Sequence, residues 1–65
     1  MKDGILRNNI KVGQQVQIVK KQDQRTGELT EGIVQKILTN SNQHPHGIKV
    51  MLEGGIVGRV KEILD

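Results

Sequence analysis

The side chains with the most suggestive chemistry are two histidines on either side of a proline, His44-Pro45-His46. Imidazole nitrogens are common metal ligands, and Asp23 or Glu53 would have to add a carboxylate. Protein metal sites need three or four ligands, and this sequence brings just two close together. We therefore expect Pro45 to rigidify a loop in which one histidine donates a hydrogen bond to a backbone carbonyl and Gly47 completes the turn, and we predict neither a metal nor a cofactor. The remaining alternative is a pH-dependent contact between a histidine and phosphate.

Basic side chains are the second candidate, because a small fold could bring several of them to one surface. The net charge is +3 and the pI is near 9.6, which suits a polyanionic partner without requiring one. The alternative is an ordinary solvated face, since four glutamates interleave with the basic residues. If the face binds RNA or DNA through phosphates, the candidate residues are Lys20, Lys21, Arg25, Lys36, Lys49, Arg59 and His46.

The missing aromatic residues restrict the partners further. The chain contains no Phe, Tyr or Trp, so it lacks the rings on which single-strand binders usually stack bases. Binding should therefore be weak, salt-sensitive and directed at the backbone of a duplex or a structured RNA. Readers of methyl-lysine and of proline-rich peptides need aromatic cages or grooves, and both are improbable. A protein-interaction or assembly module without nucleic-acid binding is the main rival hypothesis.

Catalysis has little support in the sequence. Ser41 precedes His44 by three residues, but no acid is placed to orient the histidine. Gly54-Gly55 and Gly58 are not followed by the helix that a phosphate-binding loop requires. We expect a protein that is not an enzyme.

Composition predicts the elements that must position these residues. Eight Ile and seven Val dominate the 22 hydrophobic residues of a 65-residue chain, and β-branched residues favour strands. There is no Cys, so neither a disulfide nor a cysteine metal site can support so small a core. Together these features predict a single all-β domain over residues 10–65, preceded by a lead-in over residues 1–9.

Alternation between apolar and polar residues predicts where the strands lie. An edge segment over 10–12 leads into Gly13, a strand covers about 15–20, and a turn follows over 23–27. The cleanest alternation covers 48–53, and Gly54-Gly55 is a hairpin signal before a return strand over 56–60. Residues 61–64 fit one closing helical turn.

The longest apolar run, residues 29–39, is apolar on both faces. Ile33 and Ile37 would lie on one face of a strand and Val34 and Leu38 on the other. This pattern suits a strongly bent strand, with Gly32 allowing a bend or a close approach of another segment. The same positions also match a helical stripe, although the glycine and the β-branched residues favour the strand.

Two resemblances follow from these runs. The spacing Gly13-x-x-Val16-x-Ile18, followed by Gly32-Ile33-Val34, resembles the KOW-type pattern of SH3-like barrels in ribosomal and transcription proteins. More extensively, DQRTGELTEGIV (23–34), ILTNSNQHPHGIKV (37–50) and GGIVGRV (54–60) resemble the YwbE-like family of small bacterial proteins. The resemblance implies a compact barrel without an established activity, and RNA binding is implied only by analogy of fold.

The expected architecture is a small five-stranded SH3-like (KOW-like) barrel with a short C-terminal helical turn. No apolar run has the length of a signal-peptide core or a membrane span, so we expect a cytoplasmic protein without membrane contact. We also expect a monomer. The predicted core consists of Val16, Ile18, Ile33, Val34, Ile37, Val50, Leu52, Val57 and Val60.

Overall fold

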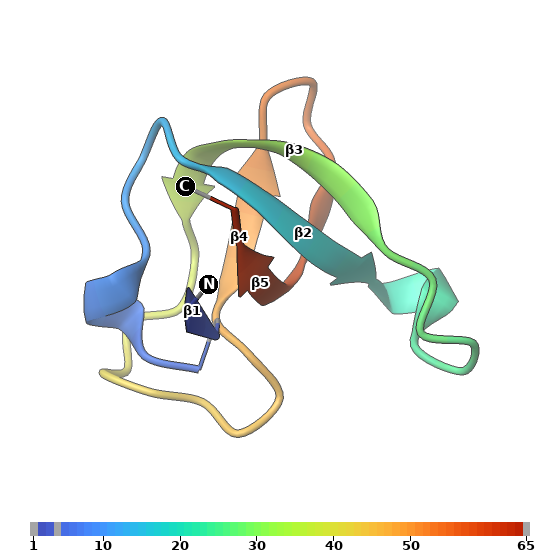
Figure 1. Cartoon of the computed structure of the whole chain (residues 1–65), viewed down its shortest axis with the longest axis horizontal. Coiled ribbons are helices and arrows are strands. Elements are labelled where there is room, and N and C mark those ends of the chain that lie inside the picture. The colour runs from blue at the N-terminus through green and yellow to red at the C-terminus, as the bar shows by residue number, and fades with distance from the viewer. Residues whose placement is uncertain (1, 4, 65) are drawn as a thin grey trace.

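The computed structural model describes residues 2–3 and 5–64, and strands account for most of its regular structure (Figure 1). Two single 3₁₀ turns, η1 and η2, are the helices of the described chain, and neither is long and apolar enough to cross a membrane. In chain order the elements are β1 (Lys2–Asp3), η1 (Arg7–Asn9), β2 (Gln15–Lys20), η2 (Lys21–Asp23), β3 (Thr30–Ile37), β4 (Lys49–Leu52) and β5 (Val57–Ile63).

The strands form one antiparallel sheet that closes on itself. The order is β1-β5-β2-β3-β4, and β4 also pairs with β5. The four longer strands β2, β3, β4 and β5 therefore make a closed barrel, while the two-residue β1 is added beside the end of β5. Closure gives each of these four strands a neighbour on both sides, which reduces the free edges at which other chains could pair. The prediction of a small all-β barrel is confirmed.

Two of the predicted elements are wrong, and four of the five predicted strands form. Residues 10–12 are not a strand. Ile10 is buried in the core, and the chain then turns through Gly13, whose N–H donates to the carbonyl of Val34 at 2.8 Å. The predicted helical turn over 61–64 is also absent, because β5 continues to Ile63 and the Leu64 N–H donates to Gln15 at 2.9 Å. Pairing with β2 and β1 keeps these residues extended.

A bulge in β3 resolves its apolar residues into an inner and an outer set. Val34 lies opposite Leu52, but Lys36 lies opposite Met51, so β3 contains one residue more than β4 at this point. Such a bulge shifts the alternation by one residue. Val34 is consequently buried and Ile37 also packs against the core, instead of lying on opposite faces as predicted. Leu38 remains exposed beyond the strand.

Gly32 does permit a close approach, as the sequence suggested. A Cβ at this position would lie 2.6 Å from Leu52 Cδ1, a distance that no methyl group tolerates. Leu52 is itself almost completely buried. The missing side chain thus lets β3 pass over a core leucine.

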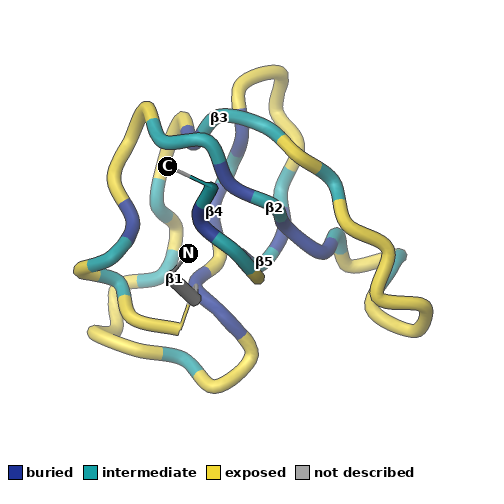
Figure 2. Tube along the Cα trace, in the orientation of Figure 1, coloured by how far each residue is buried: buried dark blue, intermediate teal, exposed yellow. Residues whose placement is uncertain are grey.

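Aliphatic side chains fill the inside of the barrel, and Figure 2 marks the buried positions along the chain in dark blue. Six of the nine predicted members are buried, whereas Ile33, Ile37 and Val57 are only half-buried. Strand parity explains Val57, because its neighbour Gly58 lies opposite the buried Val50 and Val57 must therefore point outward. The buried cluster comprises Ile10, Val16, Ile18, Val34, Ile48, Val50, Leu52, Val60 and Ile63.

Candidate nucleic-acid interface

One row of side chains crosses the outer surface of three adjacent strands. Arg59 on β5 lies opposite Val19 on β2 and opposite Lys49 on β4. Val60 and Ile18, one position away, are in the core, so strand alternation places Arg59 and Val19 on the outer face. Val19 is nevertheless only 4% exposed and is not part of the core cluster. It is therefore covered by residues on the outside of the barrel.

A bulge in β5 adds a second cation beside Arg59. Gln17 lies opposite Glu62 and Ile18 lies opposite Val60, which makes Lys61 the extra residue. Val60 and Ile63 both remain in the core, so the residues between them bulge outward. Lys61 is exposed as a result. Arg59 and Lys61 thus extend from the same stretch of β5.

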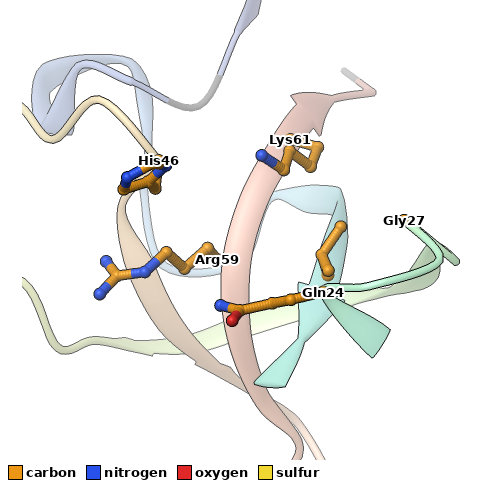
Figure 3. Close-up of a pocket in the computed structure, with 6 residues that line it drawn as sticks. Gln24, Gly27, His46, Arg59 and Lys61 are labelled. Carbon is orange, nitrogen blue, oxygen red and sulfur yellow. The ribbon is translucent and has the colours of Figure 1, made fainter. Parts of the chain in front are cut away.

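The outer face is hollowed where η2 and β5 meet the loop between β3 and β4, residues 38–48, which carries both histidines and is called the histidine loop. A first hollow of about 430 Å³ is lined by Val19, Gln24, Gly27, His46, Arg59 and Lys61. Figure 3 shows the polar ends of His46, Arg59, Lys61 and Gln24 arranged around it. These side chains come from three segments, namely β5, the turn after η2 and the loop before β4, so only the folded barrel assembles this site.

A second hollow of about 420 Å³ adjoins the first. The two share Val19, Gln24 and Arg59 as a common wall. Among the described residues that line them, the charged ones are Lys21, Lys49, Arg59 and Lys61, and none is acidic. The positive charge is therefore concentrated here even though the whole chain carries only +3. The second hollow is lined by Val19, Lys21, Gln24, Lys49, Val57, Gly58 and Arg59.

The histidine loop is anchored beside Arg59. Arg59 Nη1 donates to the carbonyl oxygen of Gly47 at 3.1 Å, and the His46 N–H donates to His44 Nδ1 at 3.1 Å. The second bond requires an unprotonated Nδ1. Partial burial lowers the pKa of His44 below its ordinary value, and the charges of Arg59 and His46 lower this pKa further. His44 thus acts as a neutral acceptor for a backbone N–H, whereas the sequence predicted a histidine bonded to a backbone carbonyl.

The rest of this loop is tied to the N-terminal segment. The His44 N–H donates to the carbonyl of Ile5 at 3.0 Å, and Arg7 Nε donates to the carbonyl of Thr39 at 2.9 Å. Leu6 also forms an isolated bridge with Gln43. These bonds between segments far apart in the chain position the loop that presents His46.

The structure brings four of the seven predicted binding residues together. Lys21, Lys49, Arg59 and His46 line the hollows. Lys20 instead lies 3.8 Å from Asp23 in an ion pair. Lys36, on β3, lies opposite Met51 of β4, and Arg25 is exposed in the turn after η2. Neither of these two residues lines a hollow.

Sequence reasoning missed two polar residues that line the hollows, Lys61 and Gln24, as well as the apolar residues and glycines between them. Lys61 was placed in a helical turn that does not form. Its signal was the two-residue spacing from Arg59, which on a continued strand puts both on one face. Gln24 had no such signal, because only the packing of η2 against β5 brings it to the hollow.

The acidic residues considered as metal ligands do not join the histidines. Asp23, in η2, forms an ion pair with Lys20 at the end of β2. Glu53 lies in the turn after β4, where its N–H donates to the carbonyl oxygen of Ile33. Within residues 2–3 and 5–64, no group of three His, Cys, Asp or Glu side chains could hold a metal ion.

Together these features define a small closed β-barrel with a basic, two-part hollow on its outer surface. The chain belongs to the family described as "Uncharacterized conserved protein (DUF2196)", whose model matches residues 3–63. It is 58% identical over 62 residues to the "Uncharacterized protein YwbE" of Bacillus subtilis (strain 168), an alignment that covers 95% of each chain. The predicted YwbE-like relationship is confirmed. No solved structure matches significantly.

Proposed function

We propose that this protein is a nucleic-acid-binding module, with an SH3-like (KOW-like) barrel that binds the backbone of RNA. One observation carries the proposal: the side chains that line the two hollows include four basic groups, three lysines and an arginine, and no carboxylate among the described residues. Phosphate contacts from lysine and arginine provide most of the non-specific affinity for nucleic acids. Several cations around a concave surface also focus the electrostatic potential.

The pre-organised guanidinium supports the same function. Arg59 is half-buried and its Nη1 is held by Gly47, so part of its rotamer freedom is already lost before a ligand arrives. The remaining guanidinium N–H groups keep the fork geometry that suits phosphate oxygens. Its neighbours Lys49 and Lys61 are exposed and contribute charge without such geometry.

A salt titration tests this proposal. Four cations that each neutralise one phosphate predict a slope of log K against log salt of about −3.6 for a duplex and about −2.8 for a single strand. The test variant replaces Lys21, Lys49 and Lys61 by Gln, which removes three charges from the hollows. With one cation remaining, the slope should fall to about −0.9 or −0.7.

A matched control distinguishes the effect of the hollows on binding from the effect of net charge. Replacing Lys11, Arg25 and Lys36 by Gln removes the same charge from exposed positions that do not line the hollows. This control should keep most of the wild-type slope. Equal slopes for the two variants would refute the proposed site. Lack of RNA or DNA binding by the wild type at low salt would refute the function and favour a protein-interaction module.

A further inference from the structure

The second hollow has an apolar floor, which phosphate binding alone does not explain. Val19 and Val57 both lie on the outer face of the barrel and both line this hollow. Gly58, between Val57 and Arg59, contributes no side chain. Lys21, Lys49 and Arg59 are the charged residues around this floor. The site therefore combines an aliphatic surface with three surrounding cations.

A ligand that fits this combination must be apolar on one side and anionic nearby. A duplex keeps the flat faces of its bases stacked inside, so it would offer the valines sugars, phosphates and base edges but no base face. An unstacked nucleotide offers a flat base together with its own phosphates. A volume of about 420 Å³ lies within the range of about 300–1,000 Å³ typical of small-ligand sites.

We propose that the second hollow seats one unstacked base of a single-stranded nucleic acid. The base rests mainly on the half-buried Val57, beside the small exposed part of Val19, and the flanking phosphates bind the cations of the two hollows. This inference rests on the proposed function, and it changes the expected ligand from a duplex backbone to a single strand.

Gln24 is placed to meet the edge of such a base. It lines both hollows, and Figure 3 shows its amide extending beside Arg59. A primary amide offers donors and an acceptor, so it can pair with any base by rotation about its terminal bond. We expect little preference among bases, because a single amide and an aliphatic floor do not discriminate one base edge from another.

The ligand-side test removes the bases and keeps the phosphates. Fluorescence anisotropy compares a short oligouridine of about ten nucleotides with an abasic ribose-phosphate strand of equal length. The abasic strand should bind about fivefold more weakly, as expected when roughly 40 Å² of apolar surface is no longer buried. Its salt slope should be unchanged, because the number of phosphates is the same.

The protein-side test makes the floor polar. Val57→Thr keeps a β-branched side chain at a half-buried position, and Val12→Thr makes the same change at an exposed position away from the hollows. Val57→Thr should weaken oligouridine binding about threefold, a value in line with the loss of roughly 25 Å² of apolar contact. It should leave abasic binding unchanged, and Val12→Thr should affect neither strand. Thermal melting of both variants verifies that they are folded.

The outcomes separate the two proposals. Equal binding of oligouridine and abasic strands would overturn the base seat and leave backbone binding intact. Weaker abasic binding without an effect of Val57→Thr would place the base elsewhere and also overturn this inference. If neither strand nor a duplex binds at low salt, the proposed function itself fails.

Discussion

The guanidinium of Arg59 and the backbone of Gly47 form a hydrogen bond, Nη1 to carbonyl oxygen, of 3.1 Å. This bond joins the outer face of β5 to the loop that carries both histidines. Gly47 is buried with φ +100° and packs closely against the backbone of Val60. The orientation of the central cation in the candidate site therefore depends on the backbone of a loop distant in sequence.

Replacing Arg59 by Lys tests whether this orientation matters for binding. Lysine keeps the charge but lacks the planar fork, so it cannot hold Gly47 and present paired N–H groups to phosphate at once. We expect RNA affinity to fall about three- to tenfold with an unchanged salt slope. Anisotropy titrations over a range of salt concentrations measure both quantities. Affinity equal to that of the wild type would mean that charge alone is sufficient at residue 59.

The close packing of Gly47 predicts a large stability loss on substitution. A Cβ there would lie 2.3 Å from the backbone oxygen of Val60, in addition to the strain of φ +100°. Gly47→Ala should therefore cost about 3 kcal/mol or more. Gly54→Ala is the matched control, because φ is +96° but the space around it is open, and about 1 kcal/mol is expected. Urea unfolding measures both values, and similar costs would contradict the predicted contact.

The stability lost on truncating an isoleucine should depend on how deeply that side chain is buried. Ile48 is completely buried, whereas Ile33 is only half-buried at the outer side of β3. Ile48→Ala should lower the free energy of unfolding by about 2–5 kcal/mol, a large part of the stability of so small a domain. Ile33→Ala should cost about 1 kcal/mol. Urea midpoints of the two variants provide the comparison. An equal loss of stability would contradict the outward, half-buried position of Ile33 on β3.

The lowered pKa of His44 predicts that acid weakens the fold. The unfolded histidine takes up its proton near pH 6.5, whereas the folded one resists protonation until lower pH. Between these two values the unfolded state binds more protons, so stability falls as the pH decreases from 6.5 toward the folded pKa. Protonation of Nδ1 also removes the acceptor of the His46 N–H.

Melting temperatures of the wild type and of His44→Gln across this pH range test the effect. Glutamine does not titrate, so the variant should lose part of the decrease between pH 6.5 and 5. His46→Gln is the control for removal of an imidazole from the same loop. An identical pH dependence for the wild type and His44→Gln would rule out the proposed role of this residue.

The alternation of apolar and polar residues was sufficient to predict a strand and its buried positions where the strand has one inner and one outer face. The strand predicted over 15–20 coincides with β2, and alternation correctly placed Val50 and Leu52 in the core. It failed at the bulges, because one inserted residue reverses which side chains point inward. The register against the partner strand determines such an insertion, and Ile37 was placed on the wrong face relative to Val34 for this reason. Lys61 was misplaced because β5 continues where a helical turn was expected.

The sequence by itself determined the class of fold, the family and the chemical nature of the site. Abundant Ile and Val, frequent glycines and an excess of basic residues are properties of composition and short-range spacing. Only the tertiary structure decided which cations meet. Lys21, Lys49, Arg59 and Lys61 come from η2, β4 and β5, and closure of the barrel places them around Val19. Contacts of this kind depend on strand pairing between distant segments, which no local pattern specifies.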